Sequence, residues 1–179
     1  KDPDCRIAFI GPCAAKKLEA SRRSIRSDVD FVLTFEELMG MFEAKQINFD
    51  DLPDDPNDNF NNASADGRGF AVSGGVAQAV VNVIKKEDPT REVKVVSAQG
   101  LAECKKMMQL AAAGKYNGYL LEGMACPGGC IGGAGTIADP VRTAAVLNKY
   151  VKDAEFTDPE QSAFMSNIHM LKDDPNFEV

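Results

Sequence analysis

The sequence predicts an α/β fold with a mainly parallel sheet flanked by helices. Short apolar runs bounded by glycine or proline alternate with longer segments rich in helix-forming residues along most of the chain. Helical segments between strands return the chain to the same end of a sheet, so consecutive strands are expected to be parallel. With 179 residues, 44% hydrophobic and 26% charged, the chain is long and apolar enough to bury a core.

The first part of the sequence predicts two strands, each followed by a helix. Residues 6–11 are an apolar run that ends in Gly-Pro, and residues 14–23 are rich in helix formers. Residues 29–33 predict the second strand. Thr34 follows this strand and Glu37 lies three residues later, which is the pattern of a capping box at the start of a helix.

A long loop is expected to separate these elements from the rest. Residues 48–69 are rich in Asp, Asn, Pro and Gly and show no periodicity. The alternation then resumes, with helices predicted at 76–86, at 100–114 and from Asp139-Pro140, strands at 92–98 and 116–123, and a short last helix after Thr157-Asp158-Pro159.

Composition excludes several classes of function. A net charge of −7 argues against nucleic acid as a main partner, because phosphate binding requires the opposite balance. The sequence has no run of 18 apolar residues, so no segment is expected to span a membrane. Five cysteines are an odd number for a disulfide framework and too few for a stapled secreted domain. We therefore expect a cytoplasmic protein whose thiols bind metal.

Three cysteines lie directly after predicted strands. Cys13 follows the first strand, and Cys126 and Cys130 follow the last, separated only by Pro-Gly-Gly. Sites in parallel α/β sheets form in the loops beyond the carboxyl ends of the strands, so these loops are expected to meet. Glycine lets backbone N–H groups approach a ligand closely, and thiolates bonded to iron need such donors. The three thiols are candidate metal ligands, one short of the four that a four-iron cluster usually takes.

Two motifs carry a resemblance to a known family. GPCAAKKLEA (residues 11–20) and EGMACPGGCIGGAG (122–135) resemble the second and third signature motifs of the FeFe, or iron-only, hydrogenases. FVLTFEEL (31–38) and SGGVAQAV (73–80) are similar to stretches between those motifs. The resemblance implies one lobe of the FeFe-hydrogenase catalytic domain over residues 1–150, followed by a helical tail over residues 151–179.

The resemblance also implies a cofactor and its ligands. Cys13, Cys126 and Cys130 match three of the four cysteines that hold a four-iron, four-sulfur (4Fe-4S) cubane. Cys130 matches the thiolate that links the cubane to a two-iron subcluster with carbon monoxide and cyanide ligands. The implied reaction is the reversible reduction of protons to dihydrogen, with electrons from a ferredoxin or from an internal iron–sulfur domain.

Three further residues match catalytic positions of that family. Lys16 matches the lysine that donates a hydrogen bond to a cyanide ligand, and a cation beside an anionic ligand is physically reasonable. Met124 matches the methionine packed against the two-iron site. Glu19 matches a carboxylate of the proton path, and it lies one helical turn beyond Lys16.

The sequence also departs from the family pattern. The first signature motif, with the fourth cubane ligand and a proton-transferring thiol, is expected before Lys1, so the chain alone is expected to be inactive and without an intact cluster. Gly11 replaces the usual methionine before Pro-Cys, and GGAGTI (132–137) replaces a glycine run that ends in Gln-Pro. These changes resemble the sensory branch, in which the domain reports hydrogen to a signalling module.

Two other functions stay open at this level. An iron–sulfur assembly or electron-transfer protein of the prelamin-A recognition-factor type shares the PC-x-x-KKLEA stretch, although that branch tends to lose the methionine that is Met124 here. A non-catalytic binding lobe of a multidomain sensor is the second alternative. Cys5 and Cys104 match no motif and are expected to be structural thiols.

Overall fold

The strands form two separate parallel pairs. The computed structural model describes residues 4–22, 24, 28–53, 63–162 and 165. Strand β1 (Ala8–Ile10) pairs with β2 (Phe31–Leu33), and β3 (Lys94–Gln99) pairs with β4 (Tyr119–Met124). The α/β class with parallel strands is confirmed. The expectation of one sheet is wrong, because β2 and β3 are joined by a connection with several helices that does not return β3 to the edge of β2.

The first region comprises the described part of residues 4–53. Helix α1 (Ala15–Ser21) follows β1 and packs on β2, and α2 (Phe35–Ala44) follows β2. The predicted capping box is present: Thr34 Oγ1 accepts from the Glu37 N–H at 3.2 Å, and Glu37 Oε2 accepts from the Thr34 N–H at 2.8 Å. Lys17 Nζ donates to Glu37 Oε2 at 2.7 Å and to the carbonyl of Val32 at 3.0 Å, which ties α1 to the end of β2.

The second region comprises residues 63–162. Helix α4 (Gly75–Glu87) leads to β3, and α5 (Leu101–Ala112) connects β3 to β4. The helix α6 (Pro140–Lys152) begins where predicted, because the side chain of Asp139 accepts from the Val141 and Arg142 N–H groups. Three-residue 3₁₀ turns lie at η2 (Phe49–Asp51), η3 (Cys130–Gly132) and η4 (Pro159–Gln161).

The predicted loop at 48–69 contains more structure than its composition indicates. Turn η2 lies at one end, and a short helix, α3 (Ala65–Gly69), lies at the other, while residues 54–62 are outside the described part. Ser64 caps α3, since its Oγ accepts from the Gly67 N–H at 3.1 Å. Contacts with α4 and α6 stabilise α3, which explains why a local pattern did not predict it.

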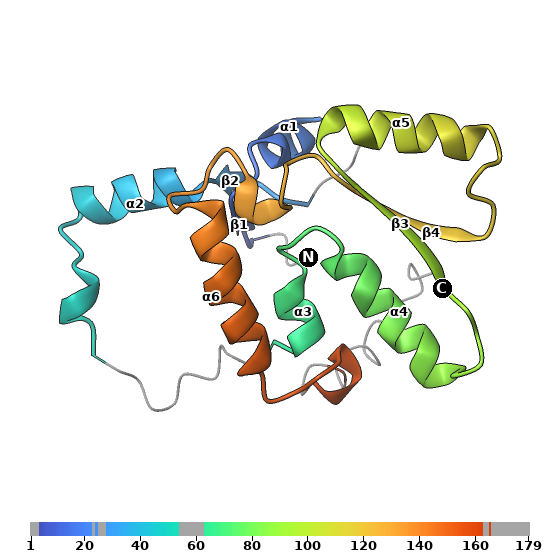
Figure 1. The fold of residues 1–179 in the computed structure, drawn as a ribbon. Coiled ribbons are helices and arrows are strands. Elements are labelled where there is room, and N and C mark those ends of the chain that lie inside the picture. The colour runs from blue at the N-terminus through green and yellow to red at the C-terminus, as the bar shows by residue number, and fades with distance from the viewer. Residues whose placement is uncertain (1–3, 23, 25–27, 54–62, 163–164, 166–179) are drawn as a thin grey trace.

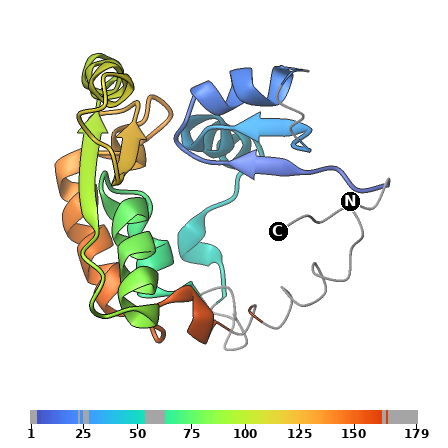
Figure 2. The same ribbon diagram turned by 90° about the vertical axis from the view of Figure 1, so that its right-hand side faces the viewer.

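The core of the described residues lies in the second region. Six apolar side chains are buried: Ala77, Ala79 and Val81 on α4, Ala98 on β3, Met107 on α5 and Ile131 in η3. Helix α5 packs on both strands of the β3–β4 sheet, and α4 lies on the other side against β4 (Figure 1). Figure 2 shows the two sheets in separate parts of the molecule.

The proposed boundary at residue 150 falls within α6, which ends at Lys152, and most of the predicted tail lies outside the described residues. Across the part of the chain that the structure describes, every helix is too short or too polar to cross a membrane.

Candidate functional site

The two motif loops meet, although they follow strands of different sheets. We call residues 125–135, which follow β4, the cysteine loop. The Gly135 N–H donates to the carbonyl of Pro12 at 3.0 Å, immediately before Cys13. A Cβ atom on Gly135 would collide with the side chain of Thr34, so the close approach requires glycine here. The segment after β4 lies beside α1 and β2 in Figure 1. The loops were predicted to share one sheet edge; instead, they follow strands of two different sheets.

The three motif cysteines interact electrostatically. All are partly buried free thiols. Burial raises the pKa of Cys130 above its usual value, and negative charge on Cys13 and Cys126 raises it further, while Lys16 lowers it. A bound cation would favour the ionised form of Cys130, whose pKa is raised here. The structure therefore brings together Cys13, Cys126, Cys130 and Lys16 from both motifs.

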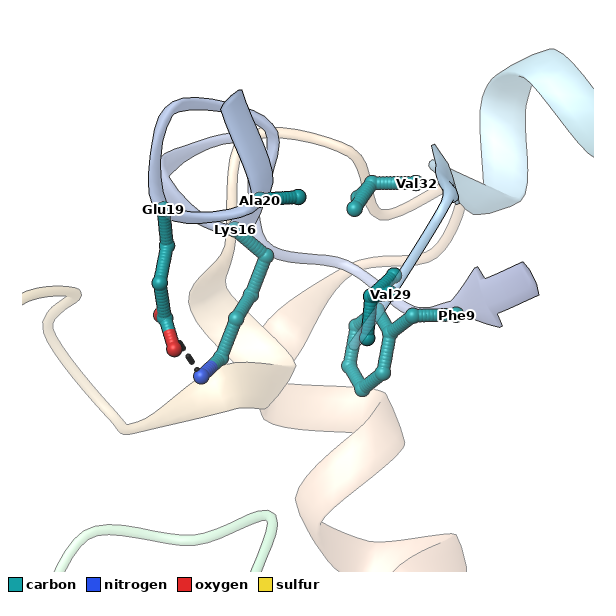
Figure 3. A pocket seen from close by; sticks show the side chains of 6 residues that line it. All are labelled: Phe9, Lys16, Glu19, Ala20, Val29 and Val32. Atoms are coloured by element: carbon teal, nitrogen blue, oxygen red, sulfur yellow. Dashed lines mark hydrogen bonds and ion pairs between the residues drawn. The ribbon is translucent and has the colours of Figure 1, made fainter. Parts of the chain in front are cut away.

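Lys16 is paired with Glu19 on the exposed surface of α1. Its Nζ lies 2.8 Å from Glu19 Oε2, and the two side chains are 44% and 42% exposed. The hydrogen bond that Lys16 donates to Glu19 is the main cause that raises the pKa of Lys16, and charge on Cys13 and Cys130 adds to it. Figure 3 shows this pair at the edge of a small cavity of about 70 Å³, which is otherwise lined by apolar side chains.

Met124 and Cys130 line different cavities. Met124 lines a cavity of about 260 Å³ with Val76 and Val80 of α4. Cys130 instead lines an apolar cavity of about 300 Å³ between the two regions, with Pro12 and Phe35 on one side. No described contact joins the Met124 side chain to the three cysteines, so its predicted role beside the two-iron half stays a prediction.

The thiols that match no motif lie apart from this group. Cys5 is exposed and precedes β1, whereas Cys13 follows that strand. The Cys104 thiol donates to the carbonyl of Ala98 at 3.5 Å and to that of Met124 at 3.4 Å. These bonds anchor α5 on the strand ends below the cysteine loop, as expected of a structural thiol.

The donor set suits a cluster better than a single ion. Among the described residues, no three Cys, His, Asp or Glu side chains stand close enough to hold one metal ion. A cluster of several iron atoms spreads its ligands more widely, and thiolates are the ligands that iron–sulfur clusters take. Three thiols with one lysine ammonium beside them fit an anionic iron–sulfur group.

The sequence alone did not identify the contacts that hold the cysteine loop. Helix α4 begins at Gly75, and the preceding Gly74 has left-handed backbone (φ 92°) and no side chain to cap the first N–H groups. The carboxylate of Glu122, on β4, caps them instead. A predicted helix start without a capping side chain is a signal that another segment supplies the acceptor.

Comparison with known proteins identifies the family. The family model described as the iron only hydrogenase large subunit, C-terminal domain, matches residues 1–134. The chain belongs to this family. It is 32% identical over 157 residues to the periplasmic Fe hydrogenase large subunit of Nitratidesulfovibrio vulgaris, which covers 70% of this chain and 37% of that subunit.

Relatives of another function occur in the same comparisons. The cytosolic iron-sulfur assembly component 3 of Pongo abelii is 27% identical over 179 residues, covering 80% of this chain and 38% of the relative. The solved structure of the FeFe hydrogenase HydA1 from Chlamydomonas reinhardtii has a TM-score of 0.63 at 19% identity and supports the fold, covering 92% of this chain and 58% of that one. The chain thus spans less than two fifths of these two curated relatives.

Proposed function

We propose that this chain supplies three thiolate ligands and a neighbouring lysine to the cluster site of an iron-only hydrogenase. The observation that carries the proposal is the meeting of Cys13 with Cys126 and Cys130, from loops far apart in the sequence. Membership of the hydrogenase family supports iron as the metal. Negative charge on Cys13 and Cys126 raises the pKa of Cys130, which supports a cationic ligand at this place.

The residues divide the work of holding the cluster. Cys13 and Cys126 would bind the 4Fe-4S cubane, and Cys130 would bind it at the side of the two-iron subcluster. When bound, the complete cluster would relay electrons and provide the site at which protons and dihydrogen interconvert. A fourth ligand must come from outside these three thiols, since 4Fe-4S cubanes usually take four.

Lys16 and Glu19 would hold charge and protons near this site. A lysine ammonium has three N–H donors, so Lys16 can keep its bond to Glu19 and still donate to an anionic ligand. Glu19 is partly exposed and can exchange protons with water through its carboxylate. Met124 would pack beside the two-iron half, a role that its flexible, unbranched side chain suits.

We further propose the partners and the compartment. Electrons would come from a ferredoxin or an internal iron–sulfur domain; in a sensory protein, the domain would report dihydrogen to a signalling module. Cytoplasmic localisation stays a prediction: free thiols suit a reducing compartment, whereas one relative is a periplasmic subunit.

An iron–sulfur assembly or electron-transfer function is the second candidate. The 27% identity to an iron-sulfur assembly component favours it, because that relative covers more of this chain than the hydrogenase subunit does. Both candidates use iron, so iron content alone does not separate them. Infrared bands from carbon monoxide and cyanide are expected only of the hydrogenase cluster.

The test uses the polypeptide that contains this chain, purified without oxygen and supplied with iron and sulfide or a complete cluster. We expect Cys130→Ser to lose the infrared bands, and Cys104→Ser to keep them, because Cys104 is bonded to backbone carbonyls outside the cysteine group. Equal iron loss from both variants would contradict the ligand assignment. Iron uptake without infrared bands would favour the second candidate.

A further inference from the structure

Glu122 is the only buried carboxylate among the described residues, with 8% of its surface exposed. It lies on β4, immediately before the part of the chain that carries Cys126 and Cys130. We propose that Glu122 is a positioning residue, whose carboxylate holds a neighbouring segment against the cysteine loop and so fixes where the two cysteines lie. Its relevance to a cluster rests on the proposed function.

The carboxylate binds three backbone N–H groups at the start of α4. Glu122 Oε1 accepts from Val76 and Ala77, both at 3.1 Å, and Oε2 accepts from Gly74. These N–H groups have no partner within the helix, and an anion at this end also interacts favourably with the dipole of the 13-residue helix. Glu122 therefore fixes the segment that leads into α4 relative to β4.

That segment in turn binds the cysteine loop. We call residues 71–75 the clamp segment. Its Ser73 N–H donates to the carbonyl of Gly128 at 3.1 Å, and its Ala71 carbonyl accepts from the Ile131 N–H at 3.2 Å. Gly129 lies between these bonds with φ 93°, and a Cβ there would collide with Ser73 N and Ala71 O. These contacts fix the alignment of the clamp segment with the cysteine loop.

These contacts close a ring of covalent and hydrogen bonds that contains Cys126. One path runs along the chain from Glu122 to Cys126 and on to Gly128. The other runs from the Glu122 carboxylate to Gly74 and then through Ser73 to Gly128. The carboxylate is the only side chain in the second path, so its removal opens the ring while the chain and the backbone of the clamp segment stay unchanged.

Amide hydrogen exchange of the metal-free chain tests this position. In Glu122→Gln one acceptor oxygen becomes an N–H donor, and we expect exchange at Ser73 and Ile131 to become about tenfold faster or more. The Asp88 N–H, which donates to the Ile84 carbonyl at the far end of α4, should keep its rate. Glu160→Gln is the matched control, because Glu160 is a carboxylate that binds Lys86 away from the loop.

The exchange rates can support or overturn the proposed role of Glu122. Unchanged exchange at Ser73 and Ile131 overturns it, and so does equal acceleration at Asp88, because the carboxylate would then stabilise the whole helix. Glu122→Asp is the second variant if the glutamine chain does not fold. It keeps the charge but is one methylene shorter, and we expect a smaller acceleration at the same two amides.

A spectroscopic readout links the position to the cluster. In the polypeptide loaded with iron and sulfide, Glu122→Gln is expected to change the electron paramagnetic resonance signature of the reduced cluster, whereas Glu160→Gln is not. An unchanged signature would overturn the link to the cluster. If the unaltered polypeptide takes up no iron, the proposed function fails, while the exchange comparison still decides the role of Glu122.

Discussion

The two regions that meet at the cysteines differ in how they are built. In the first region β1 and β2 pair over three residues, and every residue of β1 is exposed. In the second region β3 and β4 pair over six residues, with α4 and α5 packed on them. All six buried apolar side chains of the described residues belong to the second region. The motif with Cys126 and Cys130 thus lies in a region with a buried core. The motif with Cys13 lies in a region whose described residues bury no apolar side chain.

The difference shows where the geometry of the site comes from. The second region holds its own cysteine loop through the clamp segment and Glu122. The first region holds Cys13 partly by contact with that loop, since Pro12 and Thr34 both lie against Gly135. The adjacent lysines divide these tasks: Lys17 ties α1 to β2 and α2, and Lys16 interacts with the cysteines.

The largest expected effect tests the core of the second region. Met107 on α5 is 6% exposed, and its neighbour Met108 is 58% exposed. Met107→Ala should lower the free energy of unfolding by about 2–5 kcal/mol, because it leaves a cavity, while Met108→Ala should change it by about 0.5 kcal/mol or less. Urea denaturation measures both. Similar losses of stability in the two variants would contradict the burial of Met107 and the exposure of Met108 on α5.

A second substitution tests the junction between the regions. Gly135→Ala places a methyl group against Thr34 and should lower the free energy of unfolding by about 1–3 kcal/mol. Gly40→Ala is the matched control: nothing lies within 4 Å of its added Cβ, and as a helix-interior position it should gain about 0.5–1 kcal/mol. Thermal unfolding shows whether each variant is less or more stable than the unaltered chain. A loss of stability in both variants would contradict the specific requirement for glycine at position 135.

A third prediction concerns the cap of the helix α2 in the first region. Thr34 is buried and caps α2, so Thr34→Ala should lower the free energy of unfolding by about 1 kcal/mol. Thr90→Ala, in the exposed loop before β3, should change it by about 0.5 kcal/mol or less. Chemical denaturation of the two variants gives the comparison. A Thr34 effect above that of Met107→Ala would reverse the ranking of the two regions.

The smallest effect is a pH dependence of the first region. The hydrogen bond from Lys17 is the main cause that lowers the pKa of Glu37 below its ordinary value of 4.5, and the Thr34 N–H contributes. Because the folded pKa lies below the unfolded one, the stabilisation is present above about pH 4.5 and is lost as the pH falls through the lowered pKa.

Comparison with Glu37→Gln measures that dependence. The unaltered chain should be the more stable at neutral pH, and its advantage should shrink on acidification below about pH 4.5. Thermal unfolding at several pH values follows the change. The effect is small since Glu37 is 47% exposed and solvent screens its pair with Lys17. A constant difference between the two chains at all pH values would contradict the lowered pKa.

Local patterns predicted most elements, because local interactions begin and end them. The capping box of Thr34 and Glu37 and the cap of Asp139 join residues at most three positions apart, and both are present. The short helix α3 was missed because its contacts come from α4 and α6. Two separate sheets were missed for the same reason: strand patterns do not specify which strands pair.

The sequence by itself determined the α/β class, the family and the cysteines of both motifs, since these depend on residue types and on spacing along the chain. Only the tertiary structure decided how Cys13 approaches Cys126 and Cys130 from a different sheet, and why Lys16 rather than Lys17 interacts with them. It also revealed Glu122, whose partners lie 45–48 residues earlier in the chain. Hydrogen bonds between distant segments depend on how the chain folds back, and no local pattern encodes that geometry.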